Sequence, residues 1–319
     1  MAARAATMPL QNPPPEADDG SGRGLLGIVG ETAKALLTPT GLAGAALEAT
    51  WIGLHLGLYP LGLLGSRARD HRDGYALGHL SPSQRGLAIH DVEAAHTPIL
   101  LVHGMVDNRS IFTVLRRGLK KRGFGRIETI NYSIFTGDIR VAAAQLSEEV
   151  ERLVEETGYE RIHVIGHSMG GLIARYYVTR LGGDEHVHTL VTLGTPHQGS
   201  YLAYLWNNSL TRQLRPGSAL YAELAAPVRD CKTRFIAYSS DLDQVVVPGS
   251  NAALRHESLN VHNITLHGVG HMSLPITSTV VHGISAALAH VDASGATVTP
   301  GVSALNTRRR PTGRASTAS

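Results

Sequence analysis

The stretch that most constrains the fold is the run of residues 161–172, R-I-H-V-I-G-H-S-M-G-G-L. The run 162–165 is short, β-branched and largely apolar, which is typical of a strand in a sheet whose two faces are both buried. Gly166, Ser168 and Gly170 then form the pattern G-x-S-x-G, whose glycines relieve crowding in a turn so sharp that the serine is strained and its Oγ exposed. From Gly171 onward, apolar residues recur at helical spacing. A strand before the turn and a helix after it are the context that this pattern requires, and we therefore predict that Ser168 is a nucleophile.

The segments around this turn alternate between predicted strands and helices. Such alternation predicts the α/β class, with a mostly parallel sheet and helices on both of its faces. Ligands bind at the carboxyl ends of the strands in these sheets, so Met105 and Ser168, which each follow a strand, are expected to face one crevice. The expected strands are residues 99–102, 126–132, 162–165, 188–193, 233–238 and 263–268, and the expected helices are 110–121 with Ser110 as its cap, 141–156, the helix after Ser168, and 277–291.

The composition along the chain predicts one large domain with appendages. Residues 1–24 read as a disordered lead, 67–97 as a linker with an edge hairpin, 98–291 as the α/β domain, and 292–319 as a disordered basic tail. Residues 25–66 are apolar and predicted to be helical, and 49–66 contain no charged residue. Two interpretations of 25–66 stay open, namely helices docked on the domain and association with a membrane, in which Gly53 and Gly57 would form a helix contact.

Charge and cysteine content narrow the classes of function. The formal net charge is +3, and the four arginines of the tail, offset by one aspartate, account for all of it. We therefore expect no nucleic-acid partner. The single cysteine, Cys231, excludes an intrachain disulfide and reads as structural. No signal peptide is apparent, which predicts a cytoplasmic or membrane-associated protein. The sequence contains neither an H-E-x-x-H pattern nor paired Cys/His ligands, so we expect no metal and no cofactor.

A serine nucleophile needs a base to take its proton and an acid to orient that base. Among 17 histidines, His271 stands out because it follows a strand and a glycine-containing loop and precedes the closing helix; His267 is the second candidate and His262 the third. The acid is predicted in the loop after the preceding strand, at Asp241 or Asp243, and the residues alone do not separate the two. The other histidines beside the site are expected to be engaged in packing or backbone hydrogen bonds, and these are His103, His167 and His197.

Two further parts of the site are predicted. An oxyanion formed by attack on a carbonyl needs fixed N–H donors, which we expect from the backbone of Met105 and Met169. Residues 199–228 interrupt the alternation with an apolar and aromatic stretch, which we predict to be a helical lid or a wall of the substrate pocket, with Leu205 and Trp206 in contact with substrate. The alternative is an ordinary helical excursion packed into the core.

Five motifs carry a resemblance to a known family. They are P-I-L-L-V-H-G-M at 98–105, G-H-S-M-G-G-L at 166–172, L-G-T-P-H-Q-G at 193–199, D-Q-V-V-V-P from Asp243, and G-V-G-H at 268–271. From 98 to 291 the chain thereby resembles bacterial lipases and esterases of the α/β-hydrolase superfamily, particularly the actinobacterial triacylglycerol lipases.

The resemblance implies an activity and assigns the residues. It implies a carboxylic-ester hydrolase that acts on a small-molecule or lipid ester through an acyl-enzyme, with Ser168, Asp243 and His271 as the triad and Met105 and Met169 in the oxyanion hole. In the family the acid is followed closely by a Val/Pro run, which favours Asp243 over Asp241. An acyltransferase with the same triad and a non-catalytic binding protein remain as alternatives.

Overall fold

The computed structural model describes residues 92–105, 109–130 and 137–289. The predicted lead (1–24), apolar segment (25–66) and tail (292–319) lie outside these residues, as does the predicted linker up to residue 91. The end of that linker forms a short helix, α4 (Val92–His96). In the described ranges, no helix combines the length and the apolar composition needed to cross a membrane.

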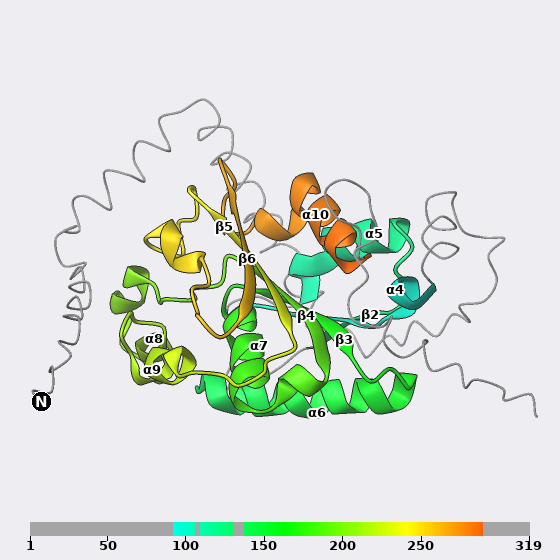
Figure 1. Cartoon of the computed structure of the whole chain (residues 1–319). Coiled ribbons are helices and arrows are strands. Elements are labelled where there is room, and N and C mark those ends of the chain that lie inside the picture. Colours follow the sequence, from blue (N-terminus) through cyan, green and yellow to red (C-terminus); the bar gives the residue numbers. More distant parts are fainter. Residues whose placement is uncertain (1–91, 106–108, 131–136, 290–319) are drawn as a thin grey trace, which may run out of the picture.

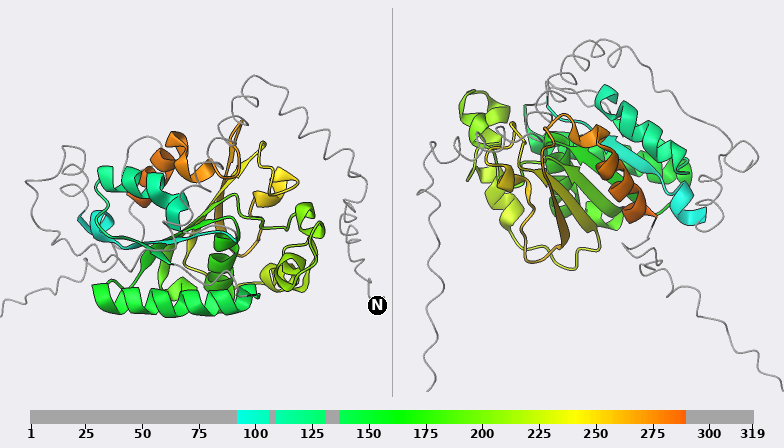
Figure 2. Two further views of the ribbon diagram at one scale, coloured as in Figure 1. Left: turned by 180° about the vertical axis from the view of Figure 1, so that it is seen from behind. Right: turned by 90° about the horizontal axis from the view of Figure 1, so that it is seen from above.

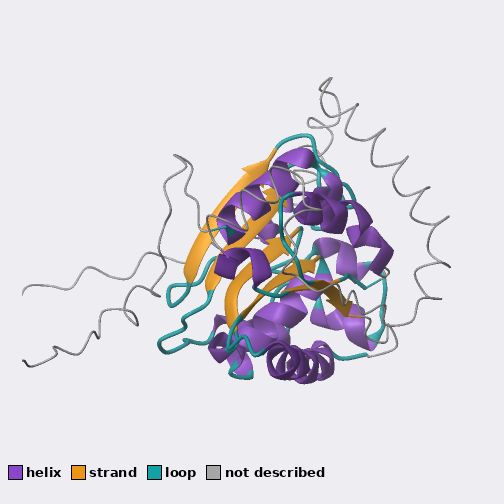
Figure 3. Cartoon of the chain, turned by 90° about the vertical axis from the view of Figure 1, so that its right-hand side faces the viewer, coloured by secondary structure: helices purple, strands orange, loops and turns teal. Residues whose placement is uncertain are grey.

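The centre of the molecule is a twisted sheet of six strands, in which every neighbouring pair is parallel (Figures 1 and 3). The order is β2-β1-β3-β4-β5-β6, so the chain adds β2 on one side of β1 and then continues on the other side. The predicted parallel sheet is therefore confirmed. The strands are β1 (Ile99–Val102), β2 (Ile127–Ile130), β3 (Ile162–His167), β4 (Val187–Leu193), β5 (Arg234–Ser240) and β6 (Asn260–Leu266).

Helices cover both faces of this sheet, as the alternation predicts (Figures 1 and 2). Helices α5 (Thr113–Lys121) and α10 (Ser278–Leu288) lie on one face, and α6 (Ile139–Thr157) and α7 (Met169–Arg180) lie on the other. Outside the β4–β5 insertion, the described connections include the 3-10 turns η3 (Arg109–Phe112), η4 (Gly183–Glu185), η6 (Gly249–Ala252) and η7 (Leu274–Ile276).

The strand side chains alternate between two buried apolar layers, because successive residues of a strand point to opposite faces. Leu100 and Val102 of β1 pack in the layer with Leu146 of α6. Ile99 and Leu101 pack in the other layer, together with α5 and α10. Burial of each such side chain contributes roughly 1.5–3 kcal/mol to folding stability. The two layers thereby fix the sheet, and the candidate site lies at the carboxyl ends of its central strands.

Most predicted elements are found within a few residues of their expected bounds, and the helix starts show why they differ. Helix α6 begins at Ile139 because the Asp138 carboxylate accepts a hydrogen bond from the N–H of Arg140 at 2.8 Å. The prediction that Ser110 caps α5 is wrong. The preceding residues form the 3-10 turn η3, so that α5 starts at Thr113 with Phe112 at its N-cap.

Residues 199–228 form an insertion between β4 and β5 with three short helical segments, η5 (Tyr201–Tyr204), α8 (Ser209–Gln213) and α9 (Ala219–Ala225). Its inner side chains, among them Leu214 and Leu224, join the α6–α7 core layer. Its first part instead exposes large apolar side chains, including Trp206. The insertion thus has a core-packed half and an exposed half, and its function as a lid stays a prediction.

Candidate active site

Ser168 occupies the sharp turn between β3 and α7. Its backbone has φ 53° and ψ −127°, a region that non-glycine residues rarely enter and that costs of the order of 1–3 kcal/mol. Two contacts hold it there. The Ser168 N–H donates to the Leu193 carbonyl at 2.8 Å, and the Thr195 hydroxyl donates to the Ser168 carbonyl at 2.9 Å. The surrounding chain therefore maintains the strained serine that the sequence motif predicts, and the structure leaves this residue half-buried.

The second glycine of the motif is required by a close backbone approach. A Cβ at Gly170 would overlap the carbonyl oxygens of Val102 and His103, at the end of β1. The first turn of α7 thereby packs directly against the exit of the neighbouring strand. This contact brings the turn that contains Ser168 next to the segment that ends in Met105.

Asp243 and His271 form a buried pair. The side chain of Asp243 is fully buried and that of His271 is 3% exposed, and Asp243 Oδ2 lies 2.8 Å from His271 Nδ1. Asp243 Oδ1 also accepts the backbone N–H groups of Val245 at 2.9 Å and Val246 at 2.8 Å, which fix the carboxylate. Because the carboxylate accepts from Nδ1, the imidazole carries its proton there and presents Nε2 as the basic nitrogen.

This pair lies beside the turn of the serine. The Nε2 of His167, the residue before Ser168, is 3.1 Å from the His271 carbonyl, and the two imidazole rings are 4.8 Å apart. On the other side, Gly194 follows Leu193, and a Cβ there would lie 2.9 Å from Asp243 Oδ2 and 3.0 Å from His271 Nδ1. Glycine at 194, with φ 56°, is what allows the pair to approach the strand ends.

The other candidates from the sequence form a second pair. Asp241 Oδ2 lies 2.7 Å from His267 Nδ1, and the His267 side chain is 79% exposed. His262 is exposed on β6. Each aspartate thus has its own histidine, and the buried pair is the one beside Ser168. This arrangement favours Asp243 and His271 as acid and base, an assignment that stays a prediction.

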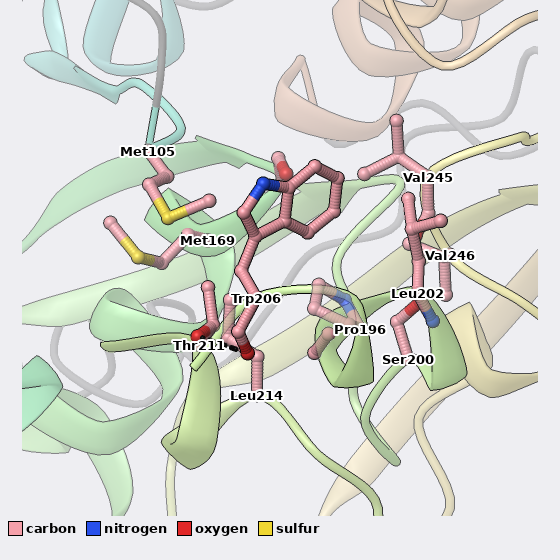
Figure 4. A pocket seen from close by; sticks show the side chains of 12 residues that line it. Met105, Met169, Pro196, Ser200, Leu202, Trp206, Thr211, Leu214, Val245 and Val246 are labelled. Carbon is pink, nitrogen blue, oxygen red and sulfur yellow. Dashed lines mark hydrogen bonds between the residues drawn. The ribbon is translucent and has the colours of Figure 1, made fainter. Parts of the chain in front are cut away.

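A mostly apolar pocket opens next to Ser168 and encloses about 500 Å³, including space open to solvent (Figure 4). Met105 and Met169 line one side, and Leu202, Val245 and Val246 line the other. Both methionines thus line the pocket beside Ser168, and their role as oxyanion donors stays a prediction.

The two predicted substrate contacts differ in position. The indole of Trp206 lies between the two sides of the pocket and contributes to its lining (Figure 4). Leu205 is 71% exposed and does not belong to that lining. The prediction for Leu205 therefore finds no support in the geometry: Leu205 and Trp206 both follow η5, and only Trp206 lines the pocket.

Burial lowers the pKa values of two basic side chains, His197 and Arg175. Burial, followed by the nearby Arg175 cation, lowers the pKa of His197 well below its usual value, and its Nε2 is 2.9 Å from the Thr192 hydroxyl. Burial also lowers the pKa of Arg175 to about 10. Arg175 donates to the carbonyls of His197 at 3.1 Å and Leu224 at 3.0 Å, which links α7 to the insertion.

The remaining predictions for histidines near the site are confirmed. His103 Nδ1 lies 2.9 Å from the Gly104 carbonyl, and His167 and His197 have the contacts given above.

Two supporting side chains were not found from sequence. Gln244 accepts the N–H of His271 at 3.2 Å, and the Ser200 hydroxyl donates to the Val245 carbonyl at 2.7 Å. Both lie inside motifs quoted for the family resemblance or next to them. Among the described residues, no group of three or more His, Cys, Asp or Glu side chains is arranged to hold a metal ion.

The site occupies the place where a ligand is expected on such a sheet. Strands β1 and β3 are neighbours, but the chain leaves β1 toward β2 on the other side. Met105 follows β1, and Ser168 follows β3. A crevice forms outside the carboxyl ends of two strands whose connections diverge in this way. The pocket is found at this crevice.

Comparison with known proteins gives the same fold. A family model described as "alpha/beta hydrolase fold" matches residues 97–225. Two solved structures share the fold at low sequence identity. Aspergillus fumigatus lipase B gives a TM-score of 0.55 at 15% identity over 62% of this chain and 53% of that chain. Bacillus licheniformis lipase BlEst2 in its propeptide form gives 0.52 at 18% identity over 70% and 55%.

Sequence relatives are similar over part of their length. The triacylglycerol lipase of Burkholderia plantarii is 29% identical over 39% of this chain and 36% of its own length, and that of Pseudarthrobacter phenanthrenivorans is 30% identical over 34% and 36%. The human lysosomal thioesterase PPT2 is 27% identical over 50% of this chain and 47% of its own length. The chain thus matches about a third to a half of each of these relatives. Together with the parallel sheet and the strained serine turn, these findings show that the chain has the α/β-hydrolase fold and is similar to bacterial triacylglycerol lipases.

Proposed function

We propose that this protein is a serine carboxylic-ester hydrolase that acts on lipid-like acyl esters through an acyl-enzyme. The observation that supports it best is the strained Ser168 at an apolar pocket, with the buried Asp243–His271 pair against the same turn. Strain at a non-glycine residue persists only where the surrounding structure maintains it, and such residues cluster at functional sites.

The proposed reaction has two halves. In the first, Ser168 Oγ attacks the ester carbonyl carbon while His271 Nε2 takes the hydroxyl proton. The backbone N–H groups of Met105 and Met169 stabilise the oxyanion, and its collapse releases the alcohol, which receives the proton from His271. In the second half, water attacks the acyl-enzyme, His271 takes a proton from it and returns that proton to Ser168 Oγ. The acid is released, and the enzyme regains its starting state.

Asp243 has an orienting role in this scheme. Two backbone N–H groups and the imidazole surround its carboxylate, so the carboxylate cannot rotate away from His271. Its negative charge stabilises the imidazolium that forms in each half of the reaction. The acid thereby supports the base without exchanging a proton itself.

The lining of the pocket supports an acyl chain as the bound group. Its walls are formed mainly by Met, Leu, Val, Ala, Pro and Trp side chains. Burying a methylene group against such walls contributes about 0.8 kcal/mol. An apolar acyl chain therefore suits the pocket better than a charged substituent.

The test compares hydrolysis of p-nitrophenyl esters of short and long acyl chains by the parent and by Ser168→Ala. We expect the variant to lose on the order of 10⁶ in turnover, because the attack step lacks its nucleophile. Ser250→Ala, at an exposed serine in η6, is the control and should keep parental activity. A phosphonate inhibitor should label Ser168, as located by mass spectrometry. Near-parental turnover of Ser168→Ala would exclude the acyl-enzyme mechanism, and a parent without activity would favour a binding protein.

The same acyl-enzyme supports two further reactions. The similarity to the lysosomal thioesterase makes thioesters a second substrate class, which a thioester of the same acyl chain tests directly. An acyltransferase would pass the acyl group to an alcohol in place of water. Analysis of the products formed with and without added alcohol distinguishes this reaction from hydrolysis.

A further inference from the structure

Two acid–imidazole pairs connect the same two loops. The loop after β5 carries Asp241 and Asp243, and the loop after β6 carries His267 and His271. Asp243 pairs with His271 in the buried site, and Asp241 pairs with His267 at the surface. The mechanism proposed above uses only the buried pair.

The Asp241 carboxylate has a second contact, which is to the backbone. Its Oδ1 accepts the N–H of Gly268 at 2.8 Å, while its Oδ2 lies 2.7 Å from His267 Nδ1. Gly268 has φ 71° and begins the short segment that ends at His271. The carboxylate therefore fixes the chain where it turns away from β6 toward the base.

The far end of this segment is fixed as well. The N–H of His271 donates to Gln244 Oε1 at 3.2 Å, and its carbonyl lies 3.1 Å from His167 Nε2. Residues 268–271 are thus tied to the loop after β5 at both ends. If the first tie is lost, the segment loses its hydrogen bond to the loop after β5 at residue 268 and keeps the one at His271.

Resting on the proposed function, we propose that Asp241 is a positioning residue for the base, and that it acts through its hydrogen bond to the Gly268 N–H. The hydrogen bond with the His267 imidazole is not the operative contact. The two side chains are 40% and 79% exposed, and exposed pairs of this kind contribute little. A backbone tie at the start of a four-residue segment instead limits where His271 can lie, and a misplacement of 1 Å at a catalytic group costs about 10²-fold in rate.

Two substitutions separate the tie from the charge. Asp241→Ala removes both contacts, whereas Asp241→Asn keeps an oxygen that can accept from the Gly268 N–H and loses the negative charge. We expect Asp241→Ala to lower kcat by about 10²-fold with KM changed less than about twofold, because residues 268–271 do not belong to the lining of the pocket. Asp241→Asn should stay within about tenfold of the parent, and His267→Gln should do the same. Glu257→Ala, at an exposed carboxylate near the other end of β6, is the matched control and should match the parent.

A spectroscopic readout keeps this inference separate from the proposed activity. In ¹⁵N-histidine-labelled protein, the Nδ1 proton of His271 is observed by NMR, and Asp243→Asn identifies its signal. We expect that signal to be retained in Asp241→Asn and to shift or broaden in Asp241→Ala. This result would support the positioning role even if the parent hydrolyses no ester.

Three outcomes would overturn the inference. The first is an Asp241→Ala variant with parental kcat and an unchanged His271 signal. The second is an Asp241→Asn variant as impaired as Asp241→Ala, because the charge would then be the operative property. The third is a large loss in His267→Gln, which would assign the role to the imidazole.

Discussion

At the scale of single residues, the two aspartates of the loop after β5 are expected to respond differently to the same change. Asp243→Asn removes the carboxylate that holds His271 Nδ1, so the imidazole can take the wrong tautomer, and turnover should fall by up to about 10⁴. Asp241→Asn keeps the acceptor for the Gly268 N–H and should change turnover by less than roughly tenfold, a cost under about 1.4 kcal/mol.

The measurement is kcat on a soluble p-nitrophenyl ester for both variants, with circular dichroism as the check on folding. A collapse in Asp241→Asn alone would move the acid to Asp241. Two equally mild losses would mean that either carboxylate serves or that the acid lies elsewhere in the chain.

Sequence alone singled out Ser168 and ranked His271 first among the histidines, because both depend on local patterns such as a turn motif or a position after a strand. It did not separate Asp241 from Asp243, since residues two apart in an extended loop can point the same way. Gln244 and Gly194 were missed for a different reason. Their roles come from contacts with His271, 27 residues later for Gln244, and with the Asp243–His271 pair for Gly194. No spacing in the sequence encodes such contacts.

At the scale of elements, the spacing of apolar residues was enough to predict which segments form strands and helices. The residues at which these elements begin and end depend on hydrogen bonds, which that spacing does not show. Strand β1 has the predicted bounds because all four of its residues are buried. Helix α5 begins later than predicted because the residues before it form a 3-10 turn. The insertion 199–228 was ambiguous because an aromatic stretch fits both a core and a pocket wall, and the structure uses it for both.

The exposed half of the insertion yields a prediction about chain length. Trp206→Gln removes an apolar wall of the pocket and should reduce kcat/KM on a long-chain ester by roughly tenfold more than on the acetate. Leu205→Gln is the matched control, since this neighbouring side chain is 71% exposed and outside the lining, and it should leave the ratio unchanged. Kinetics on the two esters give that ratio directly. Equal losses on both esters in Trp206→Gln would indicate a core role for the indole.

At the scale of the whole molecule, the buried His197 should make stability depend on pH. Burial lowers the pKa of His197 in the folded state. In the unfolded chain the same side chain has its ordinary pKa of about 6.5, so below about pH 6.5 the unfolded chain binds a proton there more readily than the folded one. Folding stability from this group is therefore complete above about pH 6.5 and is lost as the pH falls below it, with a slope of up to about 1.4 kcal/mol per pH unit.

Urea unfolding between about pH 5 and pH 8 tests this dependence. His197→Asn should flatten the fall in free energy of unfolding on the acid side, whatever its absolute stability. His262→Asn, at an exposed histidine of β6, is the control and should keep the parental slope. An unchanged slope in His197→Asn would mean that other groups cause the acid sensitivity.

The last prediction concerns residues 1–66, which lie outside the described part of the chain. Among the described residues, those that form the strained serine turn, the buried acid–base pair and the pocket all come after residue 98, so we expect the proposed chemistry not to require the N-terminal segment. Residues 49–66 contain no charged side chain, and an apolar segment of this kind favours contact with other apolar surface over water. Deleting 1–66 should therefore change solubility or partition onto lipid vesicles in flotation, while kcat/KM on a soluble acetate ester stays within about twofold of the full chain. A truncated protein that folds, as judged by circular dichroism, but loses turnover on that ester would instead place the segment at the site.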